Sequence, residues 1–173
     1  MARVPMVDAE NEPEELKLVF DQLRRTRGRV PGMYRMLAQH PGVLAAHRGY
    51  FHAALDSGVL PRAFKERIVY KVVRLCGSEY SSGTHRGYAL RHGVTAEELD
   101  AIDRSAYVGL EPRLAVALEF AEAMVKNRGR VPDDLVDQMK SHYSIKEFVE
   151  LAAVIGLVDF ACMLGAVFDL QPE

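Results

Sequence analysis

The sequence predicts an all-α fold, and three observations support this prediction. Apolar residues recur three and four positions apart in most segments of the chain, which is the spacing of one face of a helix. No segment shows a convincing alternation of apolar and polar residues, and no Asn-Gly or Asp-Gly pair marks a hairpin. Prolines and glycines stand between the apolar segments, where helices start and stop.

The first segments predict an extended arm followed by a helix with a charged end. Residues 1–12 contain a proline and several acidic residues without helical spacing. A helix then follows Pro13 and ends before Gly28, with acidic residues in its first turn and three arginines between positions 24 and 27. We interpret the arginines as a complement to the helix dipole, with a phosphate or ligand patch as the alternative.

The remaining helices each have a start signal. Two of these signals are capping boxes, which begin at Thr95 and Ser144 and have a glutamate three residues later. The last helix, over about residues 145–168, is apolar almost all round, which predicts burial on most sides. A partner subunit would complete that burial, so we expect a homo-oligomer. The predicted starts are Pro31, Pro41, Pro61, the Gly-Ser-rich junction at 77–83, Thr95, Pro112, Pro132 and Ser144.

The composition is that of a single soluble domain. The chain has 173 residues, of which 49% are hydrophobic and 27% are charged, and its formal net charge is −2. This length buries a sizeable core without disulfides or metals, and so small a net charge does not predict nucleic acid or an anionic membrane as a partner. An uninterrupted apolar run such as residues 151–158 is too short to span a membrane. We expect one domain over residues 1–173, no signal peptide, no membrane contact and a cytoplasmic location.

Two side chains that can transfer protons flank the junction at 77–83. Glu66 lies on the helix before the junction, and His85 lies on the helix after it. Antiparallel packing of these helices would bring the Glu66 carboxylate towards the His85 imidazole. Such a pair raises the pKa of a histidine and fixes its tautomer, which suits a general acid or base.

The junction itself adds hydroxyl groups. Tyr80 offers a phenol as a proton relay or oxyanion donor, and Ser78 or Ser81 could hold a carbonyl or carboxylate group. The alternative is structural: Ser81 caps a helix, Tyr80 packs in the core, and Glu66 and His85 form a buried pair. If a pocket exists here, the nearest candidates for its apolar, substrate-binding wall are Tyr50, Phe51, Met33 and Met36.

No metal and no cofactor are expected. The six histidines form no HxxxH or H-E-x-x-H pattern. The two cysteines, Cys76 and Cys162, lie far apart in the sequence within apolar helical segments, so we interpret both as buried, reduced thiols.

Nearly the whole chain resembles the alkylhydroperoxidase D-like, or carboxymuconolactone decarboxylase, family. The resemblance rests on the Arg29-Val30-Pro31 turn, the stretch 65–85, the Gly93-Val94-Thr95 turn and the segment 150–156. It implies an all-helical bundle of about eight to nine helices that assembles as a trimer or hexamer and acts on a small molecule.

The chain departs from the redox members of this family at the reacting residues. Those members carry a Cys-x-x-Cys motif between the glutamate and the histidine that Glu66 and His85 match. Here both motif cysteines are serine, in the pattern Ser78-Glu79-Tyr80-Ser81. A serine hydroxyl is too weakly acidic to attack a peroxide and forms no disulfide. Cys76 lies two positions before the motif, and we expect no second thiol beside it.

Three functional hypotheses follow. The first is a decarboxylase-like, non-redox enzyme, a lyase or isomerase, in which Glu66 and His85 transfer protons on a small organic acid, lactone or carbonyl compound. The second is a catalytically silent, oligomeric small-molecule-binding protein. The third is a thiol-dependent peroxidase that uses Cys76.

Overall fold

The all-α prediction is confirmed by the structure, a computed structural model. It describes residues 2–77 and 79–171, including their side chains except those of residues 79–81. These residues form α-helices and one π-helix, η1, and contain no strand. The elements are α1 (Glu14–Arg27), α2 (Gly32–Leu37), α3 (Pro41–Phe51), η1 (His52–Asp56), α4 (Arg62–Leu75), α5 (Glu79–Arg91), α6 (Ala96–Asp103), α7 (Pro112–Lys126), α8 (Asp133–His142) and α9 (Ile145–Val167).

The predicted start and stop signals lie at the helix ends. Both capping boxes form: Glu98 N donates to Thr95 Oγ1 at 3.2 Å, and Thr95 N donates back to Glu98 Oε2 at 2.9 Å. The second box joins Ser144 and Glu147 at the start of α9 in the same way. Gly28 ends α1 with a φ of 76°, a conformation that glycine adopts at little cost.

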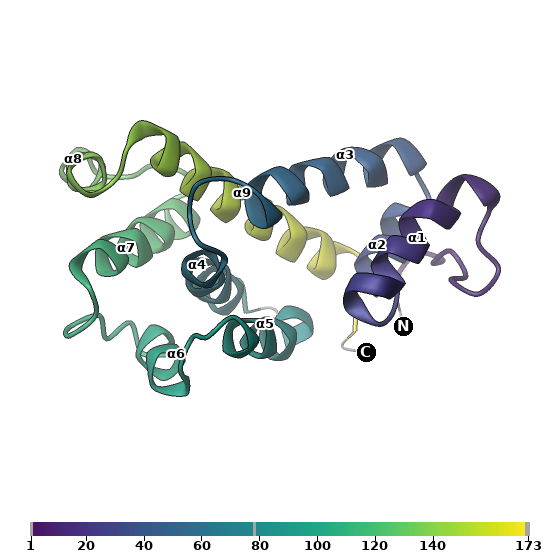
Figure 1. Cartoon of the computed structure of the whole chain (residues 1–173), viewed down its shortest axis with the longest axis horizontal. Helices are drawn as coiled ribbons and strands as arrows, with labels where there is room; N and C mark the ends of the chain where they lie inside the picture. Colours follow the sequence, from purple (N-terminus) through teal and green to yellow (C-terminus); the bar gives the residue numbers. More distant parts are fainter. Residues whose placement is uncertain (1, 78, 172–173) are drawn as a thin grey trace.

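Helix α4 is the centre of the bundle. It packs against α5, α7 and α9, which surround it in Figure 1. The reason is its sequence: apolar residues stand on nearly every side of α4, and Ile68, Val69, Val72 and Val73 are fully buried. This packing holds the face of α4 that carries Glu66 against α5.

Helices α1, α2 and α3 form the other end of the molecule (Figure 1). Their apolar faces make a second buried cluster, which includes Phe20, Leu23, Met36 and Leu44. Residues 2–12 run without helix along this end, where Val7 N donates to Arg35 O at 3.1 Å. The functional site described below lies where this end meets the α4–α5 pair.

Helix α9 is less buried than its sequence predicts. It runs along the molecule from α8 towards α2 in Figure 1 and packs on α4 and α7 with one face. Val149, Phe160, Met163 and Val167 are exposed, because the other helices of the chain cover only that one face. By length and composition alone, α9 could also cross a membrane, and 44% of its most apolar window is buried. The expectation that no apolar segment is long enough to span a membrane is therefore wrong.

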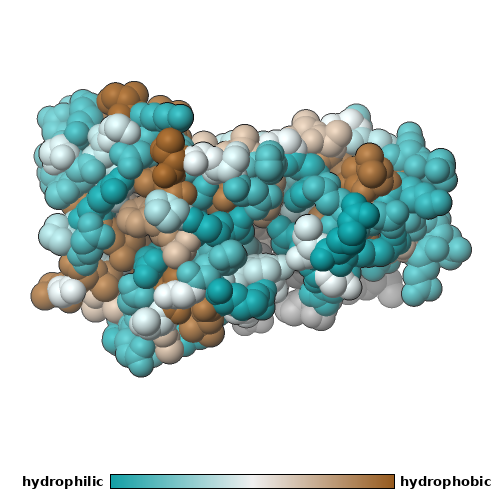
Figure 2. All heavy atoms as spheres, in the orientation of Figure 1, coloured by the Kyte–Doolittle hydropathy of each residue, from teal (hydrophilic) through white to brown (hydrophobic). Residues whose placement is uncertain are grey.

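The visible surface in Figure 2 is hydrophilic over most of its area. Apolar residues gather mainly on the half of this face that holds α7 and α8, where they form separate patches. No single continuous apolar sheet covers the face shown.

The turn between η1 and α4 is fixed to α9 by a buried ion pair. Lys65 Nζ donates to Glu150 Oε1 at 2.9 Å and to the carbonyl oxygen of Ser57 at 2.6 Å. Glu150 Oε2 accepts from Val59 N at 2.7 Å. Only 1% of Lys65 is exposed, so both charges depend on these partners. Gly58 stands inside this turn with a φ of 102°.

Replacing Gly58 with alanine should destabilise the fold by at least about 1–3 kcal/mol. A Cβ atom there would lie 2.6 Å from Glu150 Cδ, and alanine rarely adopts a φ of 102°. Urea denaturation measures the change. Gly49→Ala is the control, because Gly49 is exposed within α3 and has nothing within 4 Å of its added Cβ. The control should stabilise slightly; equal stabilities for both variants would contradict the account of the turn.

Candidate functional site

Glu66 and His85 face each other between α4 and α5, as antiparallel packing of two helices predicts. His85 Nδ1 lies 3.9 Å from Glu66 Oε2. This is an ion-pair distance and is longer than a hydrogen bond. Among the described residues, neither of these two buried atoms has a hydrogen-bond partner. The two side chains are therefore neighbours at ion-pair distance without a direct hydrogen bond.

The buried charge of Glu66 is balanced by an arginine one turn earlier. Glu66 is fully buried, and its Oε1 accepts from Arg62 Nε at 2.7 Å. Arg62 also donates to Asp56 Oδ1, in the π-helix, at 2.7 Å. Burial alone would raise the pKa of Glu66, but His85 and the Arg62 guanidinium outweigh it and lower that pKa below its usual range. Glu66 is therefore a carboxylate at neutral pH, with Oε2 left to His85.

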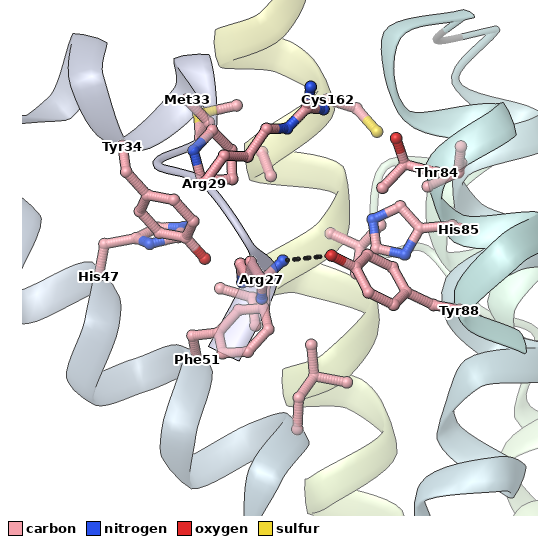
Figure 3. A pocket seen from close by; sticks show the side chains of 16 residues that line it. Arg27, Arg29, Met33, Tyr34, His47, Phe51, Thr84, His85, Tyr88 and Cys162 are labelled. Carbon is pink, nitrogen blue, oxygen red and sulfur yellow. Dashed lines mark hydrogen bonds between the residues drawn. The ribbon is translucent and has the colours of Figure 1, made fainter. Parts of the chain in front are cut away.

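His85 lines a pocket that lies where the two ends of the molecule meet. The cavity has a volume of about 120 Å³ and is bounded by α1, α2, α3, α5 and α9. Figure 3 shows Tyr34 and His47 on one side of it, His85 and Tyr88 on the other, and Arg27 between them. Since Nδ1 of His85 faces Glu66, its Nε2 is the nitrogen left for a ligand.

Most of the pocket wall is apolar, and its charged groups are cationic. Arg27 and Arg29 line it, and no carboxylate does among the described residues. The Arg27 guanidinium lies 4.9 Å from the ring centre of Phe51 and 5.5 Å from those of Tyr34 and Tyr88. Arg27 Nη1 also donates to Tyr88 Oη at 3.3 Å, the dashed line in Figure 3. A positive, partly aromatic pocket favours a small anion that has an apolar body.

Only two of the four residues predicted for the apolar wall line the pocket. Met33 and Phe51 line it. Met36 is buried in the cluster around α1 instead, and Tyr50 points to α9, where its hydroxyl donates to Ala153 O at 2.8 Å. Tyr50 and Phe51 are adjacent on α3, so their side chains point in different directions. The two side chains could therefore not both line the same pocket wall.

Three of the predicted catalytic residues are not placed. Ser78 lies outside the described residues, and so do the side chains of Tyr80 and Ser81. The backbone at positions 80 and 81 belongs to the first turn of α5. Glu66, His85 and the pocket therefore make up the part of the site that the structure describes.

The pocket contains polar side chains that sequence reasoning did not select. Tyr88 stands one turn after His85 on α5, and this spacing of three was a usable signal for a shared face. Arg27 stood out only as part of an arginine cluster, for which a ligand patch was the alternative interpretation. His47 gave no signal in the sequence, because its role depends on how α3 meets α5 and α9.

The expectation that Cys76 has no second thiol beside it is wrong. Cys162, from α9, lies against Cys76, and Asp159 accepts from Cys76 Sγ at 3.4 Å. The contact with Cys162, burial and the Asp159 carboxylate all raise the pKa of the Cys76 thiol. Sequence distance concealed this contact between α4 and α9. A raised pKa makes the Cys76 thiol a weaker nucleophile.

The site and the fold together define an alkylhydroperoxidase D-like helical protein with a Glu–His pair. Residues 41–123 match the model of the Carboxymuconolactone decarboxylase family. This match over the central part of the chain supports the family resemblance that the sequence shows.

Solved structures share the fold over nearly the whole chain. An uncharacterized peroxidase-related protein from Silicibacter sp. TM1040 has 19% identity and a TM-score of 0.86, and the match covers 99% of this chain and 90% of that one. An alkylhydroperoxidase AhpD core protein from Ralstonia eutropha JMP134 has 18% identity and a TM-score of 0.86, with coverage of 99% and 92%. The debrominase Bmp8 has 21% identity and a TM-score of 0.77, with coverage of 92% and 87%.

Curated relatives match over a shorter segment. Glutamate-1-semialdehyde 2,1-aminomutase from Nitratidesulfovibrio vulgaris strain Hildenborough is 34% identical over 64 residues, and the same enzyme from strain DP4 is 33% identical. The match covers 37% of this chain and only 15% of each of these relatives.

Proposed function

We propose that this protein is a non-redox, lyase-like or isomerase-like enzyme that transfers a proton on a small organic anion. The observation that carries the proposal is the Glu66–His85 pair at the edge of a cationic pocket. Glu66 orients the imidazole and stabilises its charged form, and His85 gives or takes the proton through Nε2.

The pocket fits a substrate that bears a carboxylate or an enolisable carbonyl. Arg27 supplies a permanent positive charge, and the apolar lining removes water from the reacting carbon. Charge that develops on a carbonyl oxygen during proton removal would be stabilised by this cation. The fold accommodates a small ring in one similar structure, a variant of the debrominase Bmp8 in complex with 2,3,4-tribromopyrrole.

The surviving groups favour proton transfer over thiol chemistry. Both positions of the family's Cys-x-x-Cys motif are serine, and the pKa of Cys76 is raised. Decarboxylation, isomerisation and lactone chemistry each need a positioned acid or base and no electron acceptor. We therefore place peroxidase activity last among the three hypotheses.

Deuterium exchange tests the proposal. It detects proton transfer at a carbon atom of the substrate, whichever product the reaction finally gives. The protein is incubated in D₂O with a panel of small oxo acids, lactones and unsaturated carboxylates, and ¹H NMR follows exchange beside the carbonyl and loss of substrate. Catalysed exchange or conversion of at least one compound is the expected result. Binding seen by thermal shift, with no exchange or conversion in the whole panel, would instead favour the silent binding protein.

We also propose that the protein assembles as a homo-oligomer, a trimer or hexamer. The support is the row of exposed apolar residues on α9, including Val149, Met163 and Val167. Covering them would complete the burial of this apolar helix. Light scattering at micromolar concentration should give a mass above that of one chain, and a monomer would contradict the proposal.

A further inference from the structure

His47 is a buried histidine whose polar atoms have no partner among the described residues. It lies on α3, lines the same pocket as His85 and is only 8% exposed. Within the part of the chain that the structure describes, neither Nδ1 nor Nε2 has a hydrogen-bond partner. Buried polar side-chain atoms are nearly always hydrogen-bonded, so this ring is an exception that needs a reason.

The neighbours of His47 pack against its ring but form no hydrogen bond with its nitrogens among the described residues. Its centre lies 5.8 Å from that of Tyr34, edge to face, and 6.3 Å from that of Phe160. Burial first, and then the charges of Arg48 and Arg27, lower the pKa of His47. The ring is therefore neutral at neutral pH, with one nitrogen as a donor and the other as an acceptor. Such a ring can bind a hydroxyl or carbonyl group of a ligand.

The position of His47 defines a second end of the pocket. In Figure 3, His47 and His85 lie on opposite sides of Arg27. The cavity of about 120 Å³ is close in size to an apolar protein cavity of about 150 Å³ that takes up benzene. A cavity of this size suits a ligand that contains one ring, which would lie between the His85 side and the His47 side.

We propose that His47 is a specificity-determining residue, which hydrogen-bonds a second polar group at the end of the ligand away from His85. The ligand class is then a ring-sized anion with polar groups at two opposite ends. This inference rests on the proposed function, because it concerns the same ligand in the same pocket. The anionic end lies on the His85 side of Arg27, and the neutral polar end lies by His47 on the other side.

Two probes that differ in one polar group test the inference. Benzoate has one polar end, and 4-hydroxybenzoate has two. Isothermal titration calorimetry at pH 7.5 should show that the wild-type protein binds 4-hydroxybenzoate about three- to tenfold more tightly, the value of one net hydrogen bond. In His47→Phe, which keeps an aromatic ring beside Tyr34, this preference should disappear while benzoate affinity stays unchanged.

The controls separate specificity from folding. His52→Phe changes an exposed histidine outside the pocket and should keep the wild-type preference. The melting temperature of His47→Phe should equal or exceed that of the wild type, since the variant buries no unpaired nitrogen. If it fails to fold, His47→Leu takes its place in the same comparison.

Three results would overturn the inference: no preference in the wild-type protein, the same preference in His47→Phe, or no binding of either probe. None of them decides the proposed function, which is measured by exchange on the wider panel. Conversely, Glu66→Gln should lose turnover and keep the probe preference, so the two proposals fail separately.

Discussion

Replacing Glu66 with glutamine should lower the rate of catalysed proton transfer by up to about 10²–10⁴-fold, the usual contribution of a positioned acid or base, because it disables His85. Glutamine keeps the shape of the side chain and the oxygen that accepts from Arg62. It removes the negative charge 3.9 Å from His85 Nδ1. Without that charge, the imidazole loses the carboxylate that orients it.

The fold should survive this substitution. Arg62 keeps its second carboxylate partner, Asp56, at 2.7 Å, so no charge is left unpaired. Circular dichroism and the melting temperature check this point. Glu119→Gln, on the exposed side of α7, is the control and should leave the rate unchanged. The double variant Glu66→Gln/His85→Ala should be no slower than His85→Ala alone, because the two residues act as a unit.

The pH dependence of the rate follows from the direction of the Glu66 pKa. Because that pKa lies below its usual range, Glu66 stays ionised from neutral into mildly acidic solution. Its contribution to stability is present above the pKa of an unfolded-state glutamate and is lost only as the pH falls through the lower folded-state value. A loss of activity at mildly acidic pH would therefore report on another group.

Breaking the Lys65–Glu150 pair destabilises the protein by about 3–5 kcal/mol, a large share of the stability of a domain. Glu150→Leu leaves the Lys65 ammonium buried with the carbonyl oxygens of Ala54 and Ser57 as its remaining partners among the described residues. It also removes the acceptor for Val59 N, which fixes the turn before α4. Urea denaturation should show a much lower midpoint.

A double-mutant cycle shows whether the loss comes from the pair. Lys65→Met/Glu150→Leu should be more stable than the sum of the two single changes predicts, because it removes both buried charges together. Glu119→Leu, at an exposed glutamate, should change stability by less than about 0.5 kcal/mol. Additive effects of the two single substitutions would contradict a direct buried pair.

The sequence predicted the helices because their signals are local. Caps such as Thr95 and Ser144, and the glycine after α1, act within a few residues of the helix end that they form. The approach of Glu66 to His85 was also predictable, since both lie near one helix junction. Short-range signals therefore indicated the fold class and the Glu66–His85 pair of the site.

The rest of the site depends on contacts between distant segments. His47, Arg27 and Tyr88 come from three helices that meet only in the folded chain. The contact of Cys76 with Cys162, and the exposure of Val149 on α9, are likewise set by packing. The sequence of a single helix does not show which other helix packs against it. The pocket residues, the thiol contact and the exposed face of α9 could therefore not be predicted.

The most direct test of the central claim, that His85 transfers a proton at this pocket, is chemical rescue. The rate of deuterium exchange on a substrate from the panel is measured for wild-type protein and for folded His85→Ala, with and without added imidazole. We predict that His85→Ala loses exchange and that imidazole restores part of it in proportion to its free-base concentration. A His85→Ala protein that exchanges deuterium at the wild-type rate would contradict this claim.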